Sequence, residues 1–96
     1  MRVRWARPAL ADLAEIHDYI AAENPVAAKQ VIRHIRQDAN ILNEHPAIGR
    51  PGRVPGTREL VVGRLPYVIA YRSGTREVHI VAVIHTSRRW PDLLPD

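Results

Sequence analysis

The sequence predicts an α+β domain in which a helical hairpin packs on a mostly antiparallel four-stranded sheet, in the order β-α-α-β-β-β. Three observations indicate this fold class. Apolar residues recur with helical spacing over residues 9–42, short alternating or wholly apolar runs occur before and after them, and a stretch rich in proline and glycine separates the two patterns. The chain has 96 residues and is 46% hydrophobic, which suits a single domain over residues 1–96 with one core.

The first strand and first helix follow from two periodicities. Residues 2–6 alternate polar and apolar side chains, with Val3 and Trp5 on one face, as in a half-buried strand. Pro8 suits the first turn of a helix, which we expect to end near Glu23. Its apolar stripe, with intervals of four, three and four residues, consists of Ala9, Leu13, Ile16 and Ile20.

Asn24 and Pro25 mark the start of a second helix, because asparagine is a favoured cap and proline a favoured first residue. The apolar stripe predicts a helix to about Glu44. It consists of Ala28, Val31, Ile32, Ile35, Ala39 and Leu42. Two amphipathic helices with almost no loop between them indicate an antiparallel hairpin packed on another layer.

Residues 45–57 contain three prolines and three glycines and are expected to form a loop. Strands follow at 58–63, 67–72 and 77–85, joined by turns at 64–66 and 73–76, and the tail 86–96 is expected to be irregular. The last two strands are apolar on both faces, so they should be central and covered. Simple alternation places His79 and His85, six residues apart, on the same face.

Several classes of protein are disfavoured by composition. Cysteine is absent, the start has charges where a signal peptide would be apolar, and no run approaches the roughly 18 apolar residues that span a membrane. We therefore expect a soluble cytoplasmic protein with no membrane association.

No familiar catalytic or ligand-binding motif is present. The two serines, Ser73 and Ser87, lie in no nucleophile elbow, and the five histidines have no third ligand at a metal-binding spacing. There is no phosphate loop and no dinucleotide fingerprint. The sequence thus predicts neither a metal nor a cofactor.

Arginine is the remaining chemical signal. The formal charge is +4, and residues 46–96 carry eight arginines against four acidic residues. Such a field attracts phosphate or an acidic protein. The candidate target-binding residues are Arg50, Arg53, Arg58, Arg64, Arg72, Arg88, Arg89 and Trp90. A solvated basic face, with arginine usage set by a GC-rich genome, is the alternative.

Five segments of the chain together resemble a known family. They are Ala9-x-x-Asp12-Leu13-x-x-Ile16, His45-Pro46-x-x-Gly49-Arg50, and the runs 58–63, 67–72 and 81–91. Their order and spacing resemble the RelE/ParE superfamily of toxins from type II toxin–antitoxin systems, over about residues 2–91. The resemblance implies a β-α-α-β-β-β fold, a cognate antitoxin, and either poisoning of DNA gyrase or cleavage of messenger RNA in the ribosomal A site.

Departures from the nuclease pattern favour the ParE-like branch, an inhibitor of gyrase rather than an enzyme. Val68 stands where RelE-like nucleases carry an arginine, the preceding lysines are missing, and Leu93 and Leu94 replace a tyrosine near the end. If the chain is instead a ribosome-dependent nuclease, its catalytic residues would be Arg88, His85, Arg64 and Arg58. A toxin-like interaction module without toxicity is the third possibility.

The resemblance also implies a hetero-oligomer in which an acidic antitoxin lays a helix on the hairpin. The candidate antitoxin-binding residues are Leu13, Ile16, Tyr19, Ile20, Ile35, Ile41 and Leu42. Alternatively, Tyr19 and Ile41 are scattered surface apolar residues. We expect no sequence-specific DNA binding by this chain.

Overall fold

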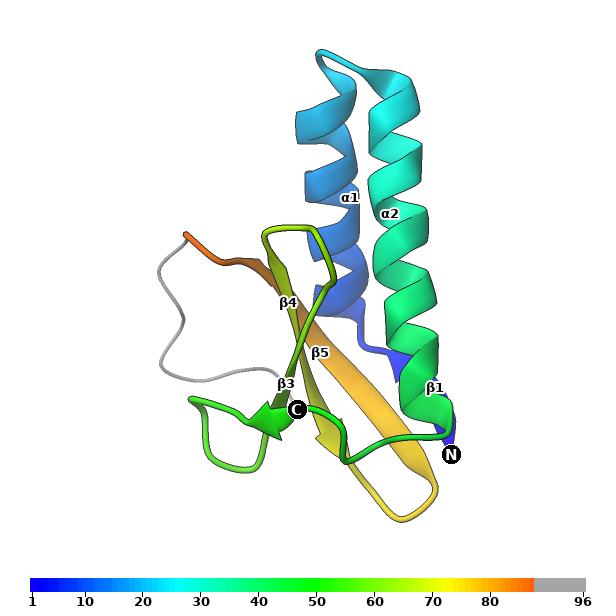
Figure 1. Cartoon of the computed structure of the whole chain (residues 1–96), viewed down its shortest axis with the longest axis vertical. Helices are drawn as coiled ribbons and strands as arrows, with labels where there is room; N and C mark the ends of the chain where they lie inside the picture. The colour runs from blue at the N-terminus through cyan, green and yellow to red at the C-terminus, as the bar shows by residue number, and fades with distance from the viewer. Residues whose placement is uncertain (88–96) are drawn as a thin grey trace.

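The computed structural model describes residues 1–87 and has two layers, a helical hairpin and a sheet (Figure 1). The helices lie side by side on one face of the sheet, and the tip of the hairpin extends well beyond it. The elements are β1 (Arg2–Trp5), α1 (Arg7–Ala21), α2 (Pro25–Asn40), the 3-10 turn η1 (Ile41–Asn43), β2 (Arg50–Pro51), β3 (Arg58–Val61), β4 (Tyr67–Ser73) and β5 (Glu77–His85).

Both predicted helices form, but each α-helix is shorter than predicted. The Asn24 side chain accepts a hydrogen bond from the Ala27 amide at 3.1 Å, which caps α2 as expected. α1 ends at Ala21 rather than near Glu23, because the chain must leave the helix before this new cap. The helix predicted to reach Glu44 ends at Asn40 and tightens into η1, where Leu42 is fully buried.

The sheet has five strands, not the four predicted, in the order β1-β5-β4-β3-β2. The extra strand, β2, lies in the segment predicted to be a loop and pairs with β3 through Arg50 opposite Glu59 and Pro51 opposite Arg58. Two residues are too few to show any periodicity in a sequence. β1 runs parallel to β5 and the other pairs are antiparallel, so the sheet is mostly antiparallel as predicted.

A β-bulge in β5 changes which face of the sheet the side chains of residues 82–85 occupy, relative to simple alternation from residue 77. Ala70 is opposite Ala82 but the next residue, Tyr71, is opposite Ile80, so Val81 is the extra residue. Ile80 and Val83 therefore both lie in the core beneath the helices. The prediction that His79 and His85 share a face is wrong, because the bulge falls between them: His85 is paired with core residue Tyr67 and His79 with Arg72 on the other face.

The main core lies between the helices and the sheet, where Ile35, Leu42, Ile69, Tyr71 and Ile80 are fully buried. A smaller apolar cluster lies on the opposite face of the sheet. It consists of Val54, Ala70, Val81, Ala82 and Ile84. Val54 comes from the segment between β2 and β3, so this segment contributes cover to the second face, as the two apolar strands predicted.

Candidate functional site

The segment between η1 and β2 is fastened to the sheet by the hydroxyl of Tyr71. This hydroxyl accepts a hydrogen bond from the Gly49 amide at 2.9 Å and donates one to the Pro46 carbonyl at 2.8 Å. A Cβ atom on Gly49 would lie 2.6 Å from the Tyr71 hydroxyl oxygen. The His45-Pro46-x-x-Gly49-Arg50 pattern thus has a structural explanation, because only glycine permits this close approach.

Glu59 of β3 organises the residues that follow. Its carboxylate is almost fully buried, accepts hydrogen bonds from the Arg50 guanidinium at 3.0 and 3.2 Å, and accepts another from the Arg53 amide at 2.7 Å. Arg58 donates to the Gly49 carbonyl at 2.8 Å. Arg50 and Arg58, predicted to bind a target, therefore contribute to holding the β2 segment in place.

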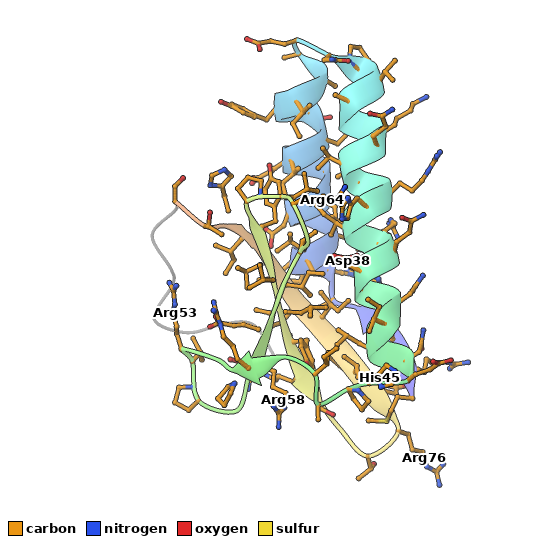
Figure 2. All side chains as sticks on the ribbon, in the orientation of Figure 1. Asp38, His45, Arg53, Arg58, Arg64 and Arg76 are labelled. Carbon is orange, nitrogen blue, oxygen red and sulfur yellow. The ribbon has the colours of Figure 1, made fainter. Side chains whose placement is uncertain are left out.

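Of the predicted arginines within residues 1–87, four lie around the β2–β3 segment and one lies apart from them. Figure 2 shows Arg53 and Arg58 near β2 and β3, whereas Arg64 lies on the turn beside α2. That turn is fixed to α2 by a hydrogen bond from the Gly63 amide to Asp38 Oδ2 at 2.9 Å. Arg72 lies near the β2–β3 segment, since its Nη1 is 3.4 Å from the Pro55 carbonyl oxygen. Arg88, Arg89 and Trp90 lie outside the described residues.

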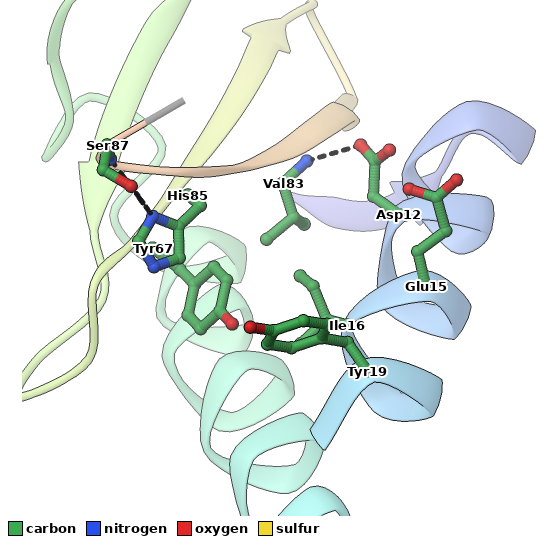
Figure 3. Close-up of a pocket in the computed structure, with 8 residues that line it drawn as sticks. All are labelled: Asp12, Glu15, Ile16, Tyr19, Tyr67, Val83, His85 and Ser87. Carbon is green, nitrogen blue, oxygen red and sulfur yellow. Dashed lines mark hydrogen bonds between the residues drawn. The ribbon is translucent and has the colours of Figure 1, made fainter. Parts of the chain in front are cut away.

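His85 lines a hollow of about 290 Å³ where α1 meets the end of β5 (Figure 3). We call it the acidic hollow. The helix contributes Asp12, Glu15, Ile16 and Tyr19, and the sheet contributes Tyr67, Val83 and His85. Among residues 1–87, the acidic side chains that line it are those of Asp12 and Glu15.

Several contacts fix the geometry of the acidic hollow. Asp12 Oδ2 accepts a hydrogen bond from the Val83 amide at 2.9 Å, which joins α1 to β5 just after the bulge. The Ser87 hydroxyl and amide lie 2.7 and 3.1 Å from His85 Nδ1. Because the amide is a donor, Nδ1 accepts and the ring proton of neutral His85 is on Nε2. The rings of Tyr67 and His85 meet edge to face at 5.3 Å.

The residues predicted for a nuclease are not assembled in the part of the chain that the structure describes. Within residues 1–87, the charged side chains that line the hollow with His85 are the carboxylates of Asp12 and Glu15. Arg58 is opposite Tyr71, four residues along β4 from the Tyr67–His85 pair, which is roughly 13 Å at the rise of a strand. Val68, in place of the nuclease arginine, is buried on the face away from the helices.

Most residues predicted to bind an antitoxin are part of the core. Leu13, Ile35 and Leu42 are buried, so they are not available to a partner docked on the folded chain. The apolar stripe that makes the hairpin amphipathic is the surface that packs on the sheet. How much of that stripe the sheet buries cannot be read from the sequence. Ile16 is nearly buried, Ile20 is partly buried, and Tyr19 and Ile41 are exposed by 81% and 41%.

The hairpin also carries a positive surface that sequence reasoning missed. A groove of about 390 Å³ is bordered by His17 of α1 and by Lys29, Arg33 and Arg36 of α2, with the half-buried Ile32 between them. We call it the basic groove. The spacing of four and three residues between its cations is a signal that could have predicted it, since such residues share one helical face.

A further charged cluster lies on the sheet face away from the helices. Glu77 accepts hydrogen bonds from His79 at 2.9 Å and from Arg4 at 3.5 Å. The hydrogen bond from His79, aided by the charge of Arg4, holds the pKa of Glu77 below its usual value. Across residues 1–87 no group of three metal-binding side chains occurs, and no helix there has the length and apolarity to cross a bilayer.

Comparison with known proteins identifies the family. A family model described as the ParE toxin of the type II toxin–antitoxin system, parDE, matches residues 3–90. The chain belongs to the ParE toxin family. This ParE-family chain is 45% identical over 93 residues to a Sinorhizobium fredii protein named "Putative toxin Y4kP", covering 97% of this chain and 96% of the relative.

Two further comparisons place this ParE-family chain in the wider RelE/ParE superfamily. It is 41% identical over 87 residues to the toxin RelE2 of Caulobacter vibrioides, covering 91% of this chain and 97% of the relative. A solved structure of the chromosomal ParDE system from P. aeruginosa superposes with a TM-score of 0.81 at 30% identity, covering 91% of this chain and 97% of that one. The α+β toxin fold is confirmed.

Proposed function

We propose that this ParE-family toxin arrests bacterial growth by poisoning DNA gyrase and is neutralised by a cognate acidic antitoxin. The observation that carries the choice of gyrase is that residues 1–87 contain no assembled phosphate-binding centre around His85. The nuclease position is occupied by buried Val68, and Arg58 is offset from the Tyr67–His85 pair by four residues, roughly 13 Å along the strand direction. RNA cleavage needs positive groups where charge develops on the phosphate.

The electrostatics of the acidic hollow support the same choice. Among residues 1–87, the charged side chains that line the hollow with His85 are the carboxylates of Asp12 and Glu15, which are not groups that bind an RNA phosphate. Two of the arginines predicted to bind a target, Arg50 and Arg58, already donate hydrogen bonds within the β2 segment. A toxin that acts by binding a protein does not require a phosphate centre.

The basic groove supports an acidic antitoxin. Lys29, Arg33 and Arg36 border it, and Ile32 offers an apolar contact between them. An acidic amphipathic segment fits this combination, because its apolar residues find Ile32 while its carboxylates meet the cations. The exposed Ile41, just beyond the end of α2, can extend the apolar contact.

The purified toxin is expected to trap gyrase on DNA. Micromolar toxin, added to gyrase, ATP and supercoiled plasmid, should convert plasmid into linear DNA after detergent and protease treatment, and preincubation with antitoxin should prevent this. The measurement is the linear fraction on a gel. Absence of linear DNA over the full range of toxin concentration would remove gyrase as the target.

Ribosome-dependent RNA cleavage is the second candidate, favoured by the 41% identity to the toxin RelE2. Programmed ribosomes incubated with the same toxin distinguish it, because a RelE-type activity would cut the message in the A site. In that case Arg88→Ala should abolish the cuts, whereas a gyrase poison produces none with either form.

A further inference from the structure

We propose that the basic groove binds the phosphate backbone of duplex DNA without reading its sequence. The binding itself depends only on the groove. Its biological setting rests on the proposed function, because a toxin that traps gyrase acts on a complex that contains DNA. The antitoxin segment assigned to the same groove then keeps the toxin silent by occupying the surface that meets the DNA.

The cations of the basic groove can attract an external anion. Lys29 and Arg33 are exposed and have no salt bridge to another side chain of residues 1–87. Arg36 is also exposed, and its guanidinium carbon lies 5.4 Å from the centre of the Trp5 ring. That contact orients Arg36 but leaves its charge in place. All three positive charges therefore act on an approaching phosphate.

The spacing of the three cations matches one strand of DNA. Lys29, Arg33 and Arg36 are four and three residues apart, so they share one face of α2 and span roughly 10 Å along its axis. One strand of a duplex carries a phosphate about every 3.4 Å along the axis, so the same length presents about three phosphates. Each cation can therefore neutralise one of three neighbouring phosphates when α2 lies along the strand.

The lining of the basic groove contains no carboxylate among residues 1–87. Besides the three cations it consists of His17, Ile32, Gln37 and Asn40. Asp18 is 3.2 Å from His17, so the α1 border adds little positive charge and the attraction comes from α2. The side-chain amides of Gln37 and Asn40 are donors that also suit phosphate oxygens.

The basic groove is accessible to a duplex. Arg33 is two residues from the buried Ile35, which places it roughly 200° around the helix and directs it away from the sheet. The hairpin extends beyond the sheet, so α2 presents a long convex surface (Figure 1). Contacts to phosphates carry no information about the bases, which agrees with the expectation that this chain does not bind a specific DNA sequence.

The test is fluorescence anisotropy of a labelled duplex titrated with the full-length chain at several salt concentrations. Neutralising three phosphates predicts a slope of about −2.7 for log affinity against log salt, which is an affinity loss of about 40-fold between about 50 and 200 mM NaCl. Lys29→Gln combined with Arg33→Gln should reduce the slope to about −0.9 and the loss to about fourfold. Circular dichroism of this variant checks that the hairpin remains folded.

Two controls accompany the measurement. Arg2→Gln combined with Arg76→Gln removes the same charge at exposed positions outside the basic groove and should leave the slope nearly unchanged. A single strand of the same length should bind more weakly than the duplex, with a slope of about −2.1, because its phosphates are less densely spaced.

An unchanged slope in the Lys29 and Arg33 double variant would overturn the inference, because the DNA would be bound elsewhere on the chain. Equal reduction in both double variants, or tighter binding of the single strand, would overturn it as well. Absence of DNA binding at low salt would assign the basic groove to the antitoxin alone. The assay contains neither gyrase nor antitoxin, so its failure is distinct from failure of the toxin to trap gyrase.

Discussion

Gly49→Ala is expected to lower the free energy of unfolding by about 2–4 kcal/mol. The new Cβ would lie 2.6 Å from the Tyr71 hydroxyl oxygen, 2.8 Å from a Tyr71 ring carbon and 2.9 Å from the Glu59 carbonyl oxygen. None of these can move easily, because Tyr71 is fully buried and Glu59 is paired in the sheet. The variant therefore has to displace the β2 segment or break the Tyr71 hydrogen bonds. Urea denaturation followed by circular dichroism measures the change.

Gly63→Ala is the matched control for this experiment. A Cβ at Gly63 would meet nothing closer than 3.8 Å, so stability should change by less than about 1 kcal/mol. Tyr71→Phe separates the two contributions, since it removes the hydroxyl and its two hydrogen bonds without adding an atom, and should cost about 1–3 kcal/mol. If Gly49→Ala were as stable as Gly63→Ala, the close approach of Gly49 to Tyr71 would be wrong.

Reversing two charges of the basic groove should weaken antitoxin binding by about 100-fold, or about 2.7 kcal/mol. The variant is Lys29→Glu combined with Arg33→Glu, both exposed on α2. Carboxylates of an acidic partner would then face like charges instead of cations. Isothermal titration calorimetry with the purified antitoxin measures the change, which should shrink as salt is raised.

Arg2→Glu combined with Arg76→Glu provides the control for net charge. It changes the formal charge by the same amount, at exposed positions that do not border the basic groove. The antitoxin should bind this variant within a few-fold of the unaltered chain. Equal weakening in the two double variants would mean that the overall positive field, rather than the basic groove, attracts the antitoxin.

The helical hairpin could be predicted because its signals are local. Asn24 caps α2 through its own side chain and Pro25 opens the helix, and both effects act within one turn. The apolar stripes of α1 and α2 likewise depend only on helical periodicity. The end of α2 could not be predicted, because η1 forms where Leu42 enters the core, and that depends on contacts with other elements.

The bulge in β5 shows why the site could not be predicted in the same way. Val81 has no partner on β4, and this one extra residue turns His85 toward α1 and leaves His79 on the other face. Nothing in the apolar run 80–84 distinguishes a bulged strand from a regular one. The acidic hollow exists because of this shift, since it joins His85 to residues of α1 from a distant part of the sequence.

The arginines also show the difference between what the sequence predicts and what depends on tertiary contacts. Their number and net charge are visible in the sequence, and they correctly indicated a basic chain. Their partners are not visible, because Arg50 meets Glu59 only when the β2 segment folds back on β3. A residue type that suits phosphate binding is thus also one that can fasten a loop.

Local periodicity, capping residues and overall charge determined the order of helices and strands, the α+β class and the resemblance to a toxin superfamily. Tertiary structure decided which apolar residues remain exposed, which arginines are engaged within the chain and which side chains line the acidic hollow. The physical reason is that periodicity and capping act between neighbours in the chain. Burial and ion pairing depend instead on elements that meet only after the hairpin has packed on the sheet.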